Sequence, residues 1–278
     1  GFQDTVNISL LCLALSDMMS LVTLLWSSIS WNPLFYHADL SFLPSDVEYL
    51  TGSLPHLLFT RVTGWITAFV AFERCVCITL PLKVKTIITA TRIKITIACV
   101  CAWVTACQAP SFYTSYLAPK FVASRNKTVM GLVFRDDSDD IDGVTYAINL
   151  VSPFGSFALV VACTVITAVQ LRRKSRWRQK TVASAPGRKQ GQEPGVSTKE
   201  QKVIKMVVMI STVFIVSFTP ANVAHIFYCA IAEQPVLLYT YWDVISVIFS
   251  FSKLFESVNA SVNFFLYYKM STRYRSTL

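Results

Sequence analysis

Residues 144–180 read VTYAINLVSPFGSFALVVACTVITAVQLRRKSRWRQK, and this stretch decides the fold. Its first 28 residues contain no Asp, Glu, Lys or Arg. A helix of that length crosses the hydrocarbon layer of a bilayer, which is roughly 30 Å thick. A dense run of basic residues follows at once. Because basic residues are retained in the cytosol during insertion, the run predicts that this end of the span faces the cell interior.

Five other apolar stretches repeat this pattern along the chain. With residues 144–171 they give six predicted membrane-spanning helices, the others being residues 6–30, 47–80, 93–113, 203–230 and 241–268. The gaps at 74–94 and 172–205 and the tail after residue 268 hold 19 of the 25 basic residues. The opposite gaps hold four basic residues against ten acidic ones. The asymmetry predicts a multi-pass plasma-membrane protein with a cytoplasmic carboxyl tail.

The composition excludes several other classes of protein. A hydrophobic fraction of 53% with 15% charged residues leaves too little polar surface for a soluble globule. The net charge of +9 does not indicate nucleic-acid binding, because the basic residues lie beside the apolar spans. The three histidines, His37, His56 and His225, are scattered, so we expect no enzyme active site and no cofactor.

The connections between spans carry their own signals. The acidic outer loop at 114–143 contains the sequon Asn126-Lys127-Thr128, which predicts glycosylation of Asn126. Residues 172–199 are too polar to bury a core, which predicts a flexible cytoplasmic loop. The basic tail 269–278 has interleaved apolar residues, which favours a short helix on the inner membrane surface.

Ionisable side chains inside an apolar span each need a partner or a watery cavity, because hydrocarbon penalises them by several kcal/mol. Asp17 lies in the middle of the first span. Either it is hydrogen-bonded to neighbouring polar side chains for packing specificity, or it holds an ion. In the second case Thr63, Asn259 and Asn263 offer a matching oxygen set, which predicts a sodium site.

One face of the second span is polar. His56, Thr60 and Thr63 recur at helical spacing, so this face should point into the bundle. His56 is nearest the outer surface, which makes it either a pocket residue or a structural histidine.

Three charged residues remain to be placed within the spans. Arg61 is about 140° around the helix from His56, and it needs acceptors such as Gln108 or Asn149 on neighbouring spans. Lys253 and Glu256 are three residues apart in the last span, so they either neutralise each other or line a pocket for a charged ligand.

Six motifs, in order and on the expected spans, resemble the rhodopsin-like (class A) family of G-protein-coupled receptors. They are Asn7-x-x-Leu10-x-x-x-Ala14-x-x-Asp17, Glu73-Arg74-Cys75, Trp103, Pro153, Phe214-x-x-x-Phe218-Thr219-Pro220 and Asn263-Phe264-Phe265-Leu266-Tyr267. Residues 72–85 and 259–271 further resemble molluscan orphan receptors, a group that includes candidate chemosensory receptors and relatives of neuropeptide receptors.

The resemblance implies an all-α membrane protein with the seven-helix receptor bundle. Six transmembrane helices are present in residues 1–268, followed by the short surface helix, and we expect the chain to be a fragment lacking the first transmembrane helix. It also implies an extracellular ligand, either a neuropeptide or a chemosensory small molecule, and a heterotrimeric G protein as partner. We place the ligand against a set of five residues, which are His56, Thr60, His225, Lys253 and Glu256.

The resemblance also implies a switch at the inner ends of the helices. Arg74, beside Glu73, would pair with Glu200, and Phe214 and Phe218 would repack near the Pro220 bend. Asn263 and Tyr267 belong to the seventh-helix signature. Tyr49 stands where the family has a disulfide cysteine, so the anchoring of the second outer loop is open. A proton- or ion-coupled transporter is the alternative, but it should show repeated halves, and none is visible.

Overall fold

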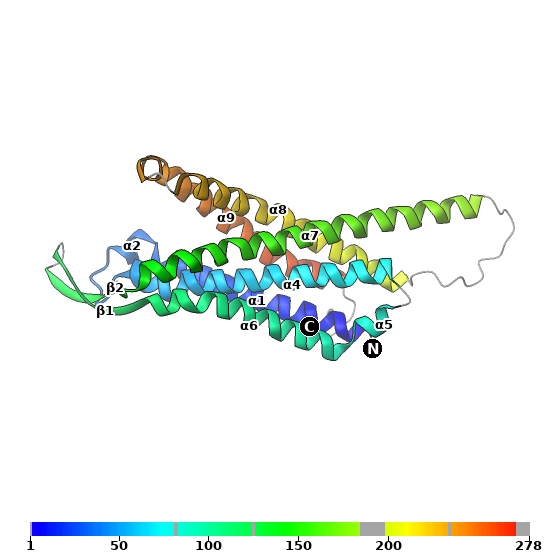
Figure 1. Ribbon diagram of the computed structural model, residues 1–278, viewed down its shortest axis with the longest axis horizontal. Helices are drawn as coiled ribbons and strands as arrows, with labels where there is room; N and C mark the ends of the chain where they lie inside the picture. The colour runs from blue at the N-terminus through cyan, green and yellow to red at the C-terminus, as the bar shows by residue number, and fades with distance from the viewer. Residues whose placement is uncertain (1, 81–82, 124–125, 184–197, 233–234, 271–278) are drawn as a thin grey trace.

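The computed structural model describes residues 2–80, 83–123, 126–183, 198–232 and 235–270. Within these ranges the protein is a bundle of long helices with short elements at the connections (Figure 1). The long helices are α1 (Phe2–Ser30), α4 (Leu54–Thr79), α6 (Ala90–Thr114), α7 (Ser138–Ala183), α8 (Thr198–Ala232) and α9 (Pro235–Met270). The fold is therefore a mainly helical membrane bundle, as the hydropathy pattern predicts.

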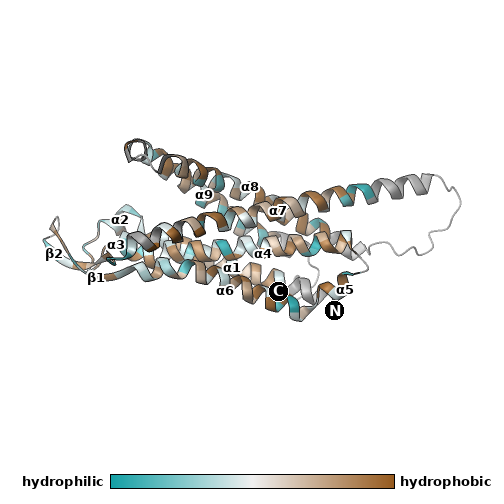
Figure 2. Cartoon of the chain, viewed as in Figure 1, coloured by the Kyte–Doolittle hydropathy of each residue, from teal (hydrophilic) through white to brown (hydrophobic). Residues whose placement is uncertain are grey.

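Five of the described stretches are long and apolar enough to cross a membrane. They are residues 8–30, 44–79, 90–114, 143–173 and 204–230. Apolar residues dominate the length of the bundle, and hydrophilic ones gather where α6 begins and where α7 leaves the bundle (Figure 2). The predicted sixth span, 241–268, lies in α9 but is not among the five. Asp243, Lys253 and Glu256 interrupt its apolar run.

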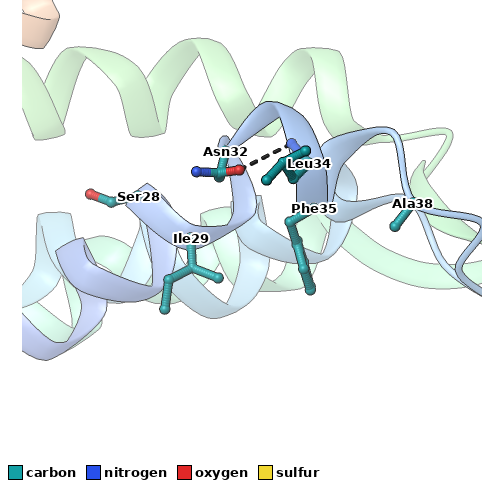
Figure 3. A pocket seen from close by; sticks show the side chains of 6 residues that line it. All are labelled: Ser28, Ile29, Asn32, Leu34, Phe35 and Ala38. Atoms are coloured by element: carbon teal, nitrogen blue, oxygen red, sulfur yellow. Dashed lines mark hydrogen bonds between the residues drawn. The ribbon is translucent and has the colours of Figure 1, made fainter.

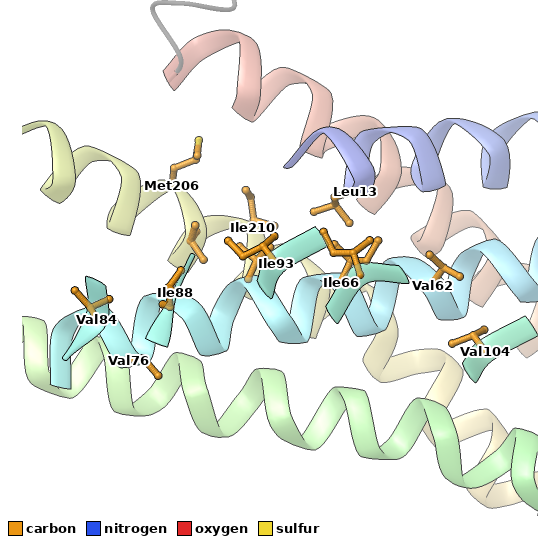
Figure 4. Packing of buried hydrophobic residues seen from close by; sticks show 13 residues of the cluster. Leu13, Val62, Ile66, Val76, Val84, Ile88, Ile93, Val104, Met206 and Ile210 are labelled. Atoms are coloured by element: carbon orange, nitrogen blue, oxygen red, sulfur yellow. The ribbon is translucent and has the colours of Figure 1, made fainter. Parts of the chain in front are cut away.

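Helix α4 is the central rod of the bundle. It packs against α1, α6, α7 and α8, and 72% of its span is buried, against 17 to 50% for the other four spans. Apolar side chains from several helices meet on it, and Leu13 of α1, Ile66 of α4, Ile93 of α6 and Ile210 of α8 belong to one buried cluster (Figure 4). Helix α4 therefore supplies much of the framework against which the other helices pack.

Helix α1 is polar inside and apolar outside. Its hydroxyl side chains at helical spacing are all buried, namely Ser9, Ser16, Ser20, Thr23, Ser27 and Ser30. Among its described side chains, the exposed ones other than Ser28 are apolar, with Leu11, Leu15 and Val22 at least half exposed. This arrangement is the reverse of that in soluble proteins, and it is typical of a helix surrounded by lipid. Hydroxyl groups that are buried between helices find hydrogen-bond partners there, whereas hydrocarbon offers none.

The outer connections form a small cap. The first contains α2 (Pro33–Tyr36), α3 (Pro44–Glu48) and a π-helical turn, η1 (Tyr49–Ser53). The second is an antiparallel hairpin of β1 (Ser115–Val122) and β2 (Lys127–Phe134), with Leu117 opposite Leu132. We expected a loop here from its composition, and the hairpin is a structural element that the sequence analysis did not anticipate.

The inner connections differ from expectation in one respect. After the short α5 (Val84–Ile87) and α6, helix α7 runs on to Ala183, so residues 172–183 of the predicted flexible loop 172–199 are helical. Residues 198–199 already belong to α8. Residues 184–197 and the tail 271–278, where a surface helix was predicted, lie outside the described residues.

Candidate functional site

Asp17 on α1 is bonded to two other helices. Thr63 Oγ1 on α4 donates to Asp17 Oδ1 at 3.0 Å, and Asn263 Nδ2 on α9 donates to Asp17 Oδ2 at 2.9 Å. Ser16 Oγ lies 2.8 Å from Thr63 Oγ1, and all four residues are buried. The structure therefore brings Asp17, Thr63 and Asn263 of the predicted sodium set together. The fourth member, Asn259, is also buried but has no described hydrogen bond to Asp17.

Two acceptor atoms of this set have no hydrogen-bond partner among the described residues. They are Oδ1 of Asn259 and Oδ1 of Asn263, and both side chains are 1% exposed. Hard cations prefer oxygen ligands. A buried carboxylate with two unsatisfied amide oxygens on the facing helix therefore fits a small cation, in which case the Thr63 hydroxyl is an additional oxygen donor.

His56 on α4 is bonded to α1 on one side and to α9 on the other. Its Nδ1 lies 3.1 Å from both Oγ and the carbonyl oxygen of Ser20, and its Nε2 lies 3.3 Å from Glu256 Oε2. Thr60 Oγ1 donates to the carbonyl of His56 at 2.8 Å. Glu256 therefore pairs with His56, and no ion pair between Lys253 and Glu256 is found among the described residues. Of the two alternatives for Glu256, the structure excludes self-pairing along the helix.

Arg61 takes the partners that the sequence analysis named. Its Nη1 donates to Oε1 of Gln108 on α6 and to Oδ1 of Asn149 on α7, the latter at 2.7 Å. Gln108 is 2% exposed. These bonds tie α4 to two neighbouring helices, but both acceptors are neutral amides and leave the guanidinium charge in place.

A cavity of about 50 Å³ lies between α4, α7, α8 and α9. Its polar lining is supplied by Thr60, Arg61, Ser156, Asn222, His225 and Glu256. Its apolar wall includes Trp65, Phe157, Phe214 and Phe218. Three of the five predicted ligand-binding residues, Thr60, His225 and Glu256, therefore share one cavity. The other two, His56 and Lys253, do not line it.

The aromatic residues predicted to act as a switch form part of this cavity wall. Phe214 and Phe218 are stacked with ring centroids 4.3 Å apart, and Phe157 of α7 lies 6.5 Å from Phe214. Pro220 lies inside α8, two residues after Phe218. Gly64 of α4 lies beside the Phe214 ring, and a Cβ there would meet Ser156 Oγ of α7 at 3.2 Å. A molecule in the cavity would therefore contact the ring pair directly.

The inner end of α4 carries two buried charges. Glu73 is 1% and Arg74 is 3% exposed, and Ser9 Oγ on α1 donates to Glu73 Oε2 at 3.3 Å. The proposed partner of Arg74, the Glu200 side chain, and the signature residue Tyr267 lie outside the described side chains, although their backbones belong to α8 and α9.

The outer hairpin is held to the first outer connection without a disulfide, and the eight cysteines of the chain are free thiols. Leu43 N donates to Met130 O, Met130 N donates to Ser41 O, and Leu132 N donates to Asp46 Oδ2, each at 2.9 Å. These bonds join the first connection to the middle of β2, at Met130 and Leu132.

Aromatic and ionic contacts complete the attachment of the hairpin. Tyr49, at the expected cysteine position, contacts the ring of Phe134 at 6.5 Å. At the hairpin tip Lys127 pairs with Asp39 at 2.5 Å, and the neighbouring sequon residue Asn126 is exposed with φ of 47°. The residue predicted to be glycosylated is therefore exposed at the hairpin tip.

A second hollow lies at the outer ends of α1 and α2 (Figure 3). Ile29, Leu34 and Phe35 contribute apolar walls, and Asn32 caps α2 by accepting a hydrogen bond from Leu34 N at 3.0 Å. None of the residues predicted to bind ligand lies there. The hollow is thus separate from the polar centre of the bundle.

Sequence reasoning missed the serines of α1. Ser9, Ser16 and Ser20 bond to Glu73, Thr63 and His56 respectively, so each supports a predicted site residue. The signal was present in the sequence, since these serines repeat at spacings of seven and four residues, which places them on one helical face.

Comparison with known families identifies the class of protein. The chain matches the family described as the 7 transmembrane receptor (rhodopsin family) over residues 2–267. Because the match covers almost the whole chain, the chain belongs to this family, whose members are membrane receptors. The family match does not support the alternative that the protein is a transporter. No curated protein matches the chain.

Proposed function

We propose that this receptor is switched by an extracellular ligand bound in the cavity between α4, α7, α8 and α9, and that it then activates a heterotrimeric G protein. One observation carries the proposal. Phe214 lines the cavity and stacks on Phe218 at 4.3 Å, immediately before the bend residue Pro220 of α8. A ligand that displaces this stack acts on the helix whose inner end begins beside the cytoplasm.

The ligand can shift the receptor only by binding one arrangement of the helices more tightly than the other. A proline inside a helix removes a backbone hydrogen bond and provides a bend. Repacking of Phe214 and Phe218 is therefore translated at Pro220 into a displacement of the inner part of α8. This displacement opens a cleft for the G protein.

At the inner end, we propose that Arg74 and Glu200 form an ion pair in the resting receptor. Glu73 beside Arg74 is buried and hydrogen-bonded to Ser9, which holds this part of α4 against α1. Outward movement of α8 carries Glu200 away and breaks the pair. The lock keeps the unliganded receptor closed.

The polar group around Asp17 is proposed to stabilise the resting arrangement. Asp17, Thr63, Asn259 and Asn263 would hold a sodium ion, which supplies a positive charge that compensates the buried carboxylate. Asp17 also joins α1, α4 and α9 directly through its hydrogen bonds to Thr63 and Asn263. A change in the hydrogen bonds of this group therefore affects the packing of all three helices.

The ligand is proposed to be a neuropeptide or a chemosensory small molecule. The outer connections carry ten acidic and four basic residues, which attract cationic ligands at long range. We also propose a cytoplasmic carboxyl tail, a glycan on Asn126 and an origin among invertebrate, molluscan-type receptors. These finer assignments rest on the residue patterns of the sequence and on the exposure of Asn126.

The proposal is tested by a G-protein dissociation assay in cells that express the receptor. Glu200→Ala removes the lock, and if the pair contributes about 1 kcal/mol, basal signalling rises roughly fivefold. Asp243→Ala, an exposed acid on α9, is the matched control and leaves basal signalling unchanged. Equal basal signalling of the Glu200 variant and the wild type, at equal surface expression, contradicts the lock.

A further inference from the structure

Arg61 carries a positive charge inside the membrane-spanning part of α4. Only some of the N–H donors of its guanidinium group have a hydrogen-bond partner. Nη1 is committed to Gln108 and Asn149. Within the part of the chain that the structure describes, Nε and Nη2 have no hydrogen-bond partner, and Arg61 takes part in no ion pair. Nε and Nη2 form the edge with which arginine binds a carboxylate through two parallel hydrogen bonds.

This charge has a cavity beside it. Arg61 lines the space between α4, α7, α8 and α9, next to Trp65, Phe157, Phe214 and Phe218. An ionised side chain within a membrane span is costly unless it is paired, and Gln108 and Asn149 do not neutralise it. The structure therefore places an uncompensated guanidinium and an aromatic wall around the same space.

The acidic residue that lines the cavity is already engaged. Glu256 Oε2 lies 3.3 Å from His56 Nε2, and Glu256 forms no ion pair with Arg61. The two charged side chains of the lining thus have separate partners, and Arg61 is left available to an incoming anion.

We propose that the receptor recognises its ligand through a carboxylate group that Arg61 binds in this cavity. The inference rests on the proposed function, since it takes the cavity as the ligand site. The carboxylate docks on Nε and Nη2 of Arg61, beside the aromatic wall formed by Trp65, Phe157 and Phe214. The cavity encloses only about 50 Å³, so it accepts the acidic end of a ligand, either a compact organic acid or the free carboxyl terminus of a peptide.

The acidic outer face and the buried arginine act at different ranges. Surface charges steer by net charge and are screened beyond about 8 Å at physiological salt. Arg61 acts by contact within the bundle. A peptide with a basic body and a free carboxyl terminus satisfies both, whereas a small organic acid satisfies only the buried contact.

The experiment measures ligand-induced thermal stabilisation of the purified receptor. The probes are phenylacetate and hexanoate, each beside its amide, and a tetrapeptide ending in phenylalanine with a free or an amidated carboxyl terminus. All are tested up to about 10 mM, where even millimolar affinity gives high occupancy. Stabilisation by the small acids identifies a compact ligand, and stabilisation by the free peptide alone identifies a carboxyl terminus.

Variants assign the effect to Arg61. Arg61→Gln is expected to abolish stabilisation by the carboxylate. Arg61→Lys keeps the charge without the two-bond edge, so it binds about tenfold more weakly, and it remains informative if the glutamine variant does not fold. Lys94→Gln, an exposed cation on α6, is the matched control and binds like the wild type.

Three results overturn the inference. They are equal stabilisation by acids and amides, full carboxylate binding by a folded Arg61→Gln receptor, and no stabilisation by any carboxylate probe. G-protein activation is recorded in parallel. A receptor that responds to a neutral ligand regardless of Arg61 refutes the carboxylate site but keeps the proposed function. Carboxylate binding that depends on Arg61 but activates no G protein supports this inference and refutes the proposed function.

Discussion

The hydrogen bond between Asp46 and the outer hairpin should control the local stability of β2. Asp46 Oδ2 accepts from Leu132 N at 2.9 Å, and the adjoining Gly131 has no side chain to hinder it, since a Cβ there would lie 3.1 Å from Asp46 Oδ2. Asp46→Ala removes the acceptor and leaves the two backbone bonds of Met130 intact. On the hairpin the perturbation is therefore confined to the Leu132 amide; on the Asp46 side it also removes the acceptor of the neighbouring Ser45 hydroxyl.

The size of the effect follows from the chemistry of this bond. A hydrogen bond to a charged acceptor contributes about 1.5 to 3 kcal/mol when buried. Because both residues are half-buried, solvent screening reduces the contribution to about 1 to 2 kcal/mol. Each 1.4 kcal/mol corresponds to a factor of ten. The Leu132 amide should therefore exchange roughly 5 to 30 times faster with solvent deuterium in the variant.

Hydrogen–deuterium exchange of the detergent-solubilised receptor, resolved to the peptide that contains Leu132, measures this effect. Asp136→Ala, an exposed acid just after β2, is the control and should leave the exchange unchanged. Reducing agent should also have no effect, because the hairpin is attached by non-covalent bonds. Unaltered exchange in the Asp46 variant, or faster exchange after reduction of the wild type, would show that something else anchors the hairpin.

Three further perturbations test the polar contacts and the outer face. His56→Ala and Glu256→Gln should each lower the melting temperature of the purified receptor. The loss of unfolding free energy in the double variant should be about 1 to 2 kcal/mol smaller than the sum of the two single losses. Strictly additive losses argue against the contact. Sodium should raise the melting temperature more than potassium does, and Asp17→Asn should abolish this difference. If the difference is retained, sodium binds at another site. Asn126→Gln should remove the glycosidase-sensitive mobility shift on gels, and persistence of that shift points to another glycan site.

Much of the bundle could be predicted because lipid imposes simple rules. Apolar length located five of the six predicted spans, and the distribution of basic residues predicts their orientation. The partners of Arg61 were also predictable, because a buried guanidinium demands acceptors and few amide side chains lie at the same depth. The α1 serines carried an equally clear periodic signal, but a serine in a membrane helix often bonds only to its own backbone, as Ser28 does with the Leu24 carbonyl.

The pairing of Glu256 could not be predicted from the sequence. A lysine three residues earlier offered a local partner, whereas His56 lies 200 residues away in the chain. The choice depends on the rotation of α9 about its axis, and packing against α8 and α1 determines that rotation. The attachment of the hairpin was hidden for the same reason, because lateral pairing of two loops has no periodicity in either one.

Among the described residues, side-chain hydrogen bonds tie α4 to its neighbours but do not tie residues 204–225 of α8 to another helix. Three side chains of α4, at His56, Arg61 and Thr63, bond to α9, α6, α7 and α1. Over residues 204–225 of α8, by contrast, the described side-chain hydrogen bonds return to the helix itself, as those of Asn222 and His225 do.

Packing alone therefore holds this part of α8 against α4, through contacts such as Phe214 on Gly64. Packing contacts are weak individually and can slide, whereas a buried hydrogen bond that breaks without a replacement costs about 1 to 3 kcal/mol. Moving α8 breaks no described interhelical hydrogen bond over residues 204–225, while moving α4 would break several. The structure thus favours α8 as the helix that moves when the cavity is filled, with Pro220 as its bend.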